Sequence, residues 1–275
     1  MCYKSGVFLL ISAFMLNSYG ATDEATKIKE EHTEHDLKSD HATQQQLYAK
    51  AIKDTEIHGF IKNPPYLVPI VPWNPELIWD KNKKRVLMAS WMSEWAMKNF
   101  YQDKLHKTIT TTDKVENAPW VTSAGEMRKF VTSFKPTEDL GLHERLNQRL
   151  GLPPREGQKY FVEFWVSPHD LFRPCLNPEI INNTCLADPA NIDAGEDYYK
   201  TFVSIPTPHY DWFVTRKKIS YTGDNPFPWS RLGTTFDWGL QTHVGFTEFV
   251  IRPNSTIEVE SITPTDDYAT MQTPS

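Results

Sequence analysis

The first twenty residues constrain this chain most, because they indicate the compartment in which it folds. Lys4 precedes an apolar run from Val7 to Leu16, and the small residues Ser18 and Gly20 follow. This layout is typical of a cleavable secretory signal peptide, and about ten apolar residues are too few to cross a bilayer as a helix. We therefore predict that residues 1–20 are a signal peptide and that the protein is exported to the periplasm or the extracellular space.

The cysteines follow from the same prediction. The chain has three, and removal of residues 1–20 would take Cys2 and leave Cys175 and Cys185. Two neighbouring cysteines in an exported chain are expected to form a disulfide bond. Asn182 and Asn254 each begin an Asn-X-Thr sequence, which is a glycosylation site only in a host that glycosylates exported proteins.

The composition argues against nucleic acids and anionic membrane surfaces as partners. The net charge is −6, and 39% of the residues are hydrophobic. An acidic chain lacks the cationic surface that nucleic acids and anionic membrane surfaces attract. No later segment approaches the roughly eighteen apolar residues of a membrane span, so we expect no stable membrane insertion after signal cleavage.

The rest of the chain divides into a globular part and two tails. Residues 21–46 are acidic, contain several histidines and have almost no large apolar residue, so we predict a flexible tail. Residues 47–264 are predicted to form a single globular domain, with the aromatic content to build a substantial core. Residues 265–275 are predicted to be a flexible C-terminal tail.

Helical patterns dominate the first half of this domain. Apolar residues recur at three- and four-residue intervals over residues 83–106, which predicts a helix. Ser123 and Glu126 have the spacing of a capping box at the start of another helix. A further helix is predicted from about 138 to 150, where Gly151 suits a left-handed C-terminal cap.

Strand patterns dominate the second half. Tyr160–Val166 is a dense aromatic and β-branched run, which predicts a buried strand. Residues 244–251 and 256–262 are predicted strands, and the turn residues 252–255 between them favour a hairpin. We therefore predict an α+β fold with a helical first half, an antiparallel sheet in the second half and one local disulfide.

Glu248 is the most informative candidate for chemistry. Alternation along the predicted strand places Phe246, Glu248 and Val250 on one face, and both faces of this strand are largely apolar. A semi-buried carboxylate needs a partner, so Glu248 is either a structural ion-pair residue or a catalytic group with a raised pKa. The familiar nucleophile, phosphate-loop and dinucleotide signatures are absent from the sequence.

A second pattern concerns histidine and aspartate. His209 and Asp211, two residues apart, are able to supply two ligands of a metal-dependent hydrolase. Residues of these types are also common in turns and helix caps. We assign no metal site from this pair alone.

Residues 245–262, GFTEFVIRPNSTIEVESI, resemble the closing hairpin of ADP-ribosyltransferase-like domains. In that family a glutamate precedes an apolar strand, a proline-containing turn and a second strand, and it stabilises the transition state of NAD cleavage. The resemblance implies this role for Glu248. It also implies a pocket walled by Trp229 and Trp238, with Arg173 holding the pyrophosphate. Phe246 stands where arginine-modifying members carry Glu or Gln, which favours NAD hydrolysis.

Three functional hypotheses follow. The default is a non-enzymatic binding or cell-envelope interaction protein that uses its Pro- and Trp-rich loops as a contact surface. One alternative is an NAD-consuming enzyme that uses Glu248, and the other is a metal-dependent hydrolase that uses His209 and Asp211. A cleft that contains Glu248 with a basic residue across from it would favour the NAD-consuming enzyme.

Overall fold

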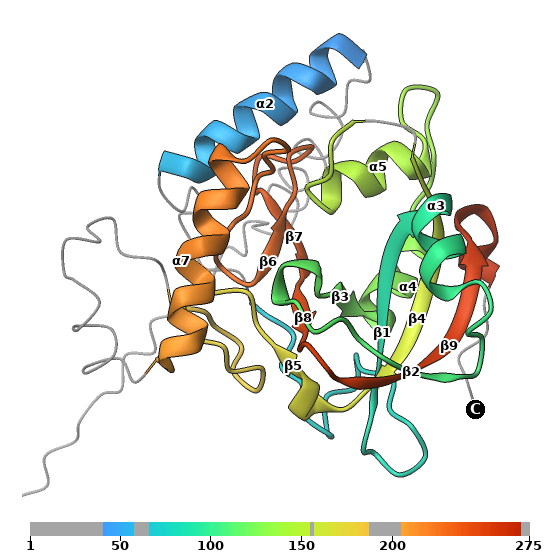
Figure 1. Cartoon of the computed structure of the whole chain (residues 1–275). Helices are drawn as coiled ribbons and strands as arrows, with labels where there is room; N and C mark the ends of the chain where they lie inside the picture. The colour runs from blue at the N-terminus through green and yellow to red at the C-terminus, as the bar shows by residue number, and fades with distance from the viewer. Residues whose placement is uncertain (1–40, 58–65, 155–156, 187–204, 271–275) are drawn as a thin grey trace, which may run out of the picture. The chain divides into compact units, whose positions relative to one another are not determined.

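The computed structural model describes residues 41–57, 66–154, 157–186 and 205–270 (Figure 1). The predicted signal peptide and all but the last six residues of the predicted acidic tail lie outside these ranges. The described residues form an α+β fold, as predicted. None of the helices in these ranges has the length and apolar character that a membrane span requires.

Helices and strands are interspersed along the described part of the chain. The α-helices are α2 (His41–Ile57), α3 (Glu94–Ala96), α4 (Ala124–Ser133), α5 (Leu142–Arg149) and α7 (Thr207–Thr222). Short π- or 3-10 turns are η1 (Met97–Tyr101), η2 (Val115–Asn117), η3 (Pro168–Asp170) and η5 (Thr265–Thr270). The strands are β1 (Val86–Ser93), β2 (Thr108–Thr110), β3 (Trp120–Ser123), β4 (Gln158–Val166), β5 (Leu171–Phe172), β6 (Thr234–Phe236), β7 (Val244–Thr247), β8 (Phe249–Ile251) and β9 (Thr256–Pro264).

The main sheet has seven strands in the order β2-β9-β4-β1-β3-β8-β5, and its pairings are antiparallel. β1 lies between β3 and β4, and its pairing with β4 runs from Val86 opposite Val166 to Ser93 opposite Gln158. β6 and β7 form a separate two-stranded sheet. The strands therefore come from both halves of the chain, so the predicted division into a helical half and a sheet half holds only loosely.

Both faces of the main sheet are buried. Val86 and Met88 of β1 belong to a cluster with Phe164 and Phe249, whereas Leu87 and the alternate residues of β1 face a second cluster. That second cluster includes residues of α4, α5 and η5, among them Met127, Leu146 and Tyr268. Alternate side chains of a strand point to opposite faces, so a doubly covered strand is apolar throughout.

The predicted helix over residues 83–106 is wrong, and this double burial is the reason. β1 occupies residues 86–93, and only Glu94–Tyr101 is helical, as α3 followed by the π-turn η1. A strand that is apolar on both faces supplies apolar residues at helical spacing as well as at strand spacing. Trp91 is buried as expected, but Trp95 is 67% exposed.

The predicted hairpin between residues 244–251 and 256–262 is also wrong. Strands form in both segments, but β8 pairs with β3 and β5, whereas β9 pairs with β4 and β2. In the sheet, β4, β1 and β3 separate β9 from β8. Residues 252–255 therefore connect two strands that are not neighbours in the sheet. β8 lies between β3 and β5, and β9 lies between β2 and β4.

Other predictions are confirmed. Ser123 caps α4, since its Oγ accepts a hydrogen bond from the Glu126 backbone N–H at 3.2 Å. A helix does form within residues 138–150, as α5, and Gly151 follows it at φ 67°. The buried strand predicted at Tyr160–Val166 is β4.

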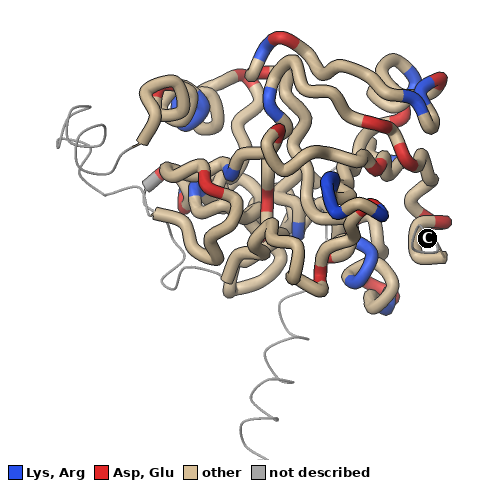
Figure 2. Tube along the Cα trace, turned by 90° about the horizontal axis from the view of Figure 1, so that it is seen from below, with Lys and Arg blue, Asp and Glu red and all other residues tan. Residues whose placement is uncertain are grey.

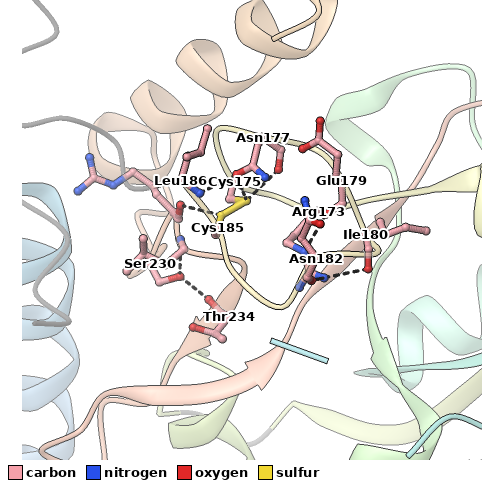
Figure 3. The surroundings of a disulfide bond; sticks show 12 residues. Arg173, Cys175, Asn177, Glu179, Ile180, Asn182, Cys185, Leu186, Ser230 and Thr234 are labelled. Atoms are coloured by element: carbon pink, nitrogen blue, oxygen red, sulfur yellow. Dashed lines mark hydrogen bonds between the residues drawn. A yellow bond between two sulfur atoms is a disulfide. The ribbon is translucent and has the colours of Figure 1, made fainter. Parts of the chain in front are cut away.

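The predicted disulfide joins Cys175 to Cys185 and closes a loop against the body of the protein (Figure 3). Arg173 lies beside it with no exposed surface. The Arg173 guanidinium donates hydrogen bonds to the backbone carbonyls of Glu179, Ile180 and Asn182, and to that of Val68. Arg173 therefore holds the disulfide loop in place.

Glu163 of β4 is fully buried and has several partners. Arg128 of α4 donates to both of its carboxylate oxygens, at 2.8 and 2.6 Å, and Ser261 and Tyr268 donate at 2.8 Å each. The Tyr268 ring also stacks on Phe161. Residues 265–270 are thus η5, anchored by a side chain that is 1% exposed, and not part of a loose tail as we predicted.

A second buried pair joins α5 to the loop after β6. Arg145 donates to both carboxylate oxygens of Asp237, at 3.0 and 2.6 Å, and Asp237 has no exposed surface. Elsewhere, basic and acidic residues are interspersed along the described part of the chain (Figure 2). The buried ion pairs Arg128–Glu163 and Arg145–Asp237 therefore differ from the charged residues that are interspersed along the described chain.

We predict that replacement Glu163→Gln lowers the free energy of unfolding by about 3 kcal/mol or more, because it leaves the buried Arg128 cation without an ionised partner. Urea denaturation of the two proteins measures this difference. The matched control is Glu94→Gln, which removes the exposed Glu94–Lys98 pair and should leave the urea midpoint almost unchanged. Equal effects of the two replacements would contradict the importance of the buried pair.

Candidate functional site

Glu248 lies at a break between two strands. β7 ends at Thr247 and pairs with β6, whereas β8 begins at Phe249 and pairs in the main sheet. Between them, the Glu248 backbone N–H donates to the Gly233 carbonyl at 2.9 Å. The chain therefore changes sheets at Glu248, and the side chain there is not confined to a continuous sheet face.

Two cavities meet at the Glu248 side chain. The larger, of about 480 Å³, is also lined by Tyr48, Trp120, Arg216 and Phe227. The smaller, of about 200 Å³, lies toward the apolar cluster that contains Trp91 and Met127. A cavity of the larger size is within the usual range for small-molecule sites. The combined space offers one open, aromatic-lined chamber and one inner recess, with a carboxyl group between them.

Arg216 of α7 is the basic residue of this site. Its guanidinium lies 4.9 Å from the ring centres of both Trp120 and Phe227, which are cation–π contacts. Its Nε is buried and has no hydrogen-bond partner. Desolvation lowers the pKa of Arg216, and the charge of Glu248 opposes that shift. Among the described residues, no ion pair or hydrogen bond neutralises the Arg216 guanidinium.

Glu248 is partly buried, and its environment favours the protonated form. Burial raises the pKa of Glu248 to about 8, although the charge of Arg216 acts in the opposite direction. No hydrogen bond to the Glu248 carboxyl group is formed by any residue within the described ranges. Near neutral pH this carboxyl group can donate a proton or a hydrogen bond, and just above pH 8 it becomes a base.

The aromatic residues that we predicted for the pocket lie behind its walls. Trp229 is buried, and its ring centre is 6.2 Å from that of Trp120. Trp238 is buried as well, and its Nε1–H donates to the Leu152 carbonyl at 3.0 Å. Trp120 and Leu152 line the larger cavity, so Trp229 and Trp238 support the walls that a ligand would contact.

Arg173 is not brought to this site. It lines neither cavity, and its guanidinium bonds to the backbone of the disulfide loop. The basic residue that shares a cavity with Glu248 is Arg216, whereas Arg173 had been expected to hold the pyrophosphate.

His209 and Asp211 do not converge on a metal site. The His209 Nε2 lies 2.7 Å from the Cys175 carbonyl oxygen, and burial lowers the pKa of His209. Asp211 is exposed on α7. In the part of the chain that the structure describes, no three His, Cys, Asp or Glu side chains are grouped so that they could hold a metal ion.

Sequence reasoning missed Trp120 and Arg216. No sequence pattern pointed to a ligand-contacting role for Trp120. The segment that contains Arg216 shows no clear helical pattern, because the apolar residues of α7 are not confined to one face. Its only local signal was Pro208, which is favourable in a first helical turn.

No protein-family model, no curated protein and no solved structure matches this chain. The function proposed below is therefore argued from the geometry of the site.

We predict that Glu248→Gln changes the pH dependence of stability. The folded state holds the Glu248 proton more tightly than the unfolded chain, so this group's contribution to the free energy of unfolding falls as pH rises from about 5 to about 8. The variant lacks this contribution. Its stability relative to wild type should increase by about 3 to 4 kcal/mol over that interval.

Urea denaturation of both proteins at several pH values measures this change. Glu94→Gln on α3 is the control, and its curve should stay parallel to that of the wild type. Parallel curves for Glu248→Gln would mean that the Glu248 pKa is not raised in the folded protein.

Proposed function

We propose that the protein is a small-molecule enzyme whose active site is the pair of cavities at Glu248. One observation carries this proposal. A partly buried carboxyl group and a guanidinium line the same cavity, and neither is neutralised by a hydrogen bond from a described residue. Ionisable groups without hydrogen-bond partners are costly inside a protein, so their presence in a cavity is typical of a functional site.

Arg216 would receive an anionic group of the substrate. The guanidinium contacts Trp120 and Phe227, and it forms no hydrogen bond with any residue that the structure describes. A guanidinium held in this way suits a carboxylate or phosphate, which accept two parallel hydrogen bonds.

Glu248 would act as the proton-transfer group. It lies at the junction of the two cavities, so a ligand that reaches from Arg216 toward the inner recess passes its carboxyl group. A pKa near the working pH is the property that efficient general acid–base catalysis requires. The aromatic and apolar walls would keep water from competing for this proton.

NAD is the substrate that we propose to test first. The resemblance of residues 245–262 to ADP-ribosyltransferase-like domains assigns the key glutamate to Glu248. A cleft with a basic residue across from Glu248 is the arrangement that this hypothesis required, and NAD offers a pyrophosphate for Arg216 and planar rings for Trp120. The different pairing of β8 and β9 means that the proposal depends on the cavity and not on the predicted hairpin.

Export is part of the proposal. The Cys175–Cys185 disulfide is the feature that supports an oxidising compartment, either periplasmic or extracellular.

A binding protein without catalytic activity is the second candidate. The exposed Trp95 and Phe100 contact each other at 5.6 Å between ring centres, next to the π-turn η1. Exposed aromatic pairs are common in protein contact surfaces. This candidate differs from our prediction for the Pro- and Trp-rich loops, because it places the contact residues on α3 and η1.

We predict that the purified, oxidised protein cleaves NAD and that Glu248→Gln lowers kcat/KM by about a hundredfold or more. Arg216→Gln should act mainly through KM, raising it by about tenfold or more. Release of nicotinamide, followed by chromatography, measures both effects. Trp95→Ala is the control and should retain the full rate.

Two outcomes separate the candidates. The first outcome is that NAD is not cleaved, and that neither NAD nor inorganic phosphate causes a fluorescence change in wild type that is absent in Trp120→Phe. This outcome refutes the small-molecule site and makes the Trp95 surface the better hypothesis. If NAD is cleaved, the pH profile assigns the chemistry. A rate that falls above about pH 8 identifies Glu248 as a proton donor, and a rate that rises identifies it as a base or an anion.

A further inference from the structure

A second cleft, which the proposed active site does not use, lies around Glu126 and Arg149. It has a volume of about 790 Å³ and shares no lining residue with the two cavities at Glu248. Its walls include the apolar side chains of Val68, Ile78 and Phe130.

The Glu126 side chain does not form the capping hydrogen bond that its sequence position predicts. In a reciprocal capping box its carboxylate would accept from the Ser123 backbone N–H. Instead, its two oxygens lie 3.3 Å from the Thr247 backbone nitrogen, and the Thr122 hydroxyl donates at 3.4 Å. These are long bonds for a buried carboxylate, and burial raises the pKa of Glu126 to about 7. The carboxyl group retains capacity for a stronger donor.

Arg149 lines the same cleft, and among the described residues it has neither an ion-pair nor a side-chain hydrogen-bond partner. Its guanidinium lies 4.8 Å from the Phe130 ring centre and 4.5 Å from that of Phe246. Its Nε is buried without a hydrogen-bond partner, and desolvation lowers the pKa of Arg149. Within the described ranges, no carboxylate forms an ion pair with Arg149.

Two nearby buried arginines differ from Arg149 in having a carboxylate partner. Arg128 is bound to both oxygens of Glu163, and Arg145 to both oxygens of Asp237. Arg149 and Glu126 interact electrostatically but form no hydrogen bond with each other, and both line the same cleft. The cleft therefore offers a guanidinium without a hydrogen-bonded carboxylate and a carboxyl group whose hydrogen bonds are long.

We propose that this cleft is a second binding site, for a small zwitterion of the amino-acid type whose carboxylate binds Arg149 and whose ammonium group binds Glu126. A plain anion would face Glu126 and Glu76, and a plain cation would face Arg149 and Lys129. A zwitterion satisfies both signs at once. Its apolar side chain would lie against Val68, Ile78 and Phe130.

The test uses L-leucine and L-phenylalanine as probes, because their side chains match this wall. Each is titrated into the isotopically labelled full-length protein, and the backbone amide signals of Gly125 and Thr247 are followed by NMR. N-acetyl-L-leucine, which lacks the ammonium group, and L-leucinamide, which lacks the carboxylate, are the matched ligands. Each should bind about tenfold or more weakly than L-leucine.

The variants Glu126→Gln and Arg149→Gln should each weaken L-leucine binding by about tenfold or more. Arg216→Gln, in the other cavity, should bind normally, which separates this site from the proposed active site. The proposal is overturned if neither probe shifts these amide signals at millimolar concentration, or if the two modified ligands bind as well as L-leucine. The comparison of ligands uses wild-type protein, so it remains decisive even if a variant fails to fold.

Discussion

The structure depends on a central pair of strands, β1 and β4, that is covered on both faces. Such a position removes side chains from water on either side, so any charge placed there must be matched completely. Glu163 meets this requirement through Arg128, Ser261 and Tyr268, which come from three different elements. The Glu163 carboxylate thus links α4, β9 and η5 to the middle of the sheet.

Arg216 and Arg149 are in a different state from these ion pairs. Each contacts two aromatic rings and leaves a buried Nε without a hydrogen-bond partner among the described residues. Each lines a cavity with a glutamate whose pKa is raised by burial. The two glutamates meet the same short stretch of backbone, since Glu126 contacts the Thr247 N–H and Glu248 is the next residue. The same physical arrangement therefore occurs twice, on separate cavities.

Local signals in the sequence predicted local structure well. The Ser123 cap, the left-handed Gly151 and the aromatic strand at Tyr160–Val166 depend on neighbours in the chain, and the structure contains all three. Residues 83–106 were misjudged because an apolar pattern on both faces does not distinguish a helix from a central strand. The hairpin was misjudged because a turn sequence does not reveal which earlier strands leave open edges.

The candidate site was only partly predictable, for a related reason. Glu248 was found because an acidic residue inside an apolar strand conflicts with burial. Its partners Trp120 and Arg216 come from β3 and α7, and nothing in their own segments marks them. The family resemblance implied a pyrophosphate-binding role for Arg173, but its guanidinium is bound by the backbone carbonyls around it. Contacts between distant segments are set by the tertiary structure, and a single sequence does not display them.

The position of β9 has a consequence for how the molecule is assembled. β9 is the last strand in the chain, yet it lies between β2 and β4. Until residues 256–264 are available, β4 presents an unpaired, largely apolar edge, which is a template for association with other chains. Pairing over such separations in sequence also makes folding slow. A chain that is kept unfolded until it is complete, as exported chains commonly are, would never expose that half-built sheet.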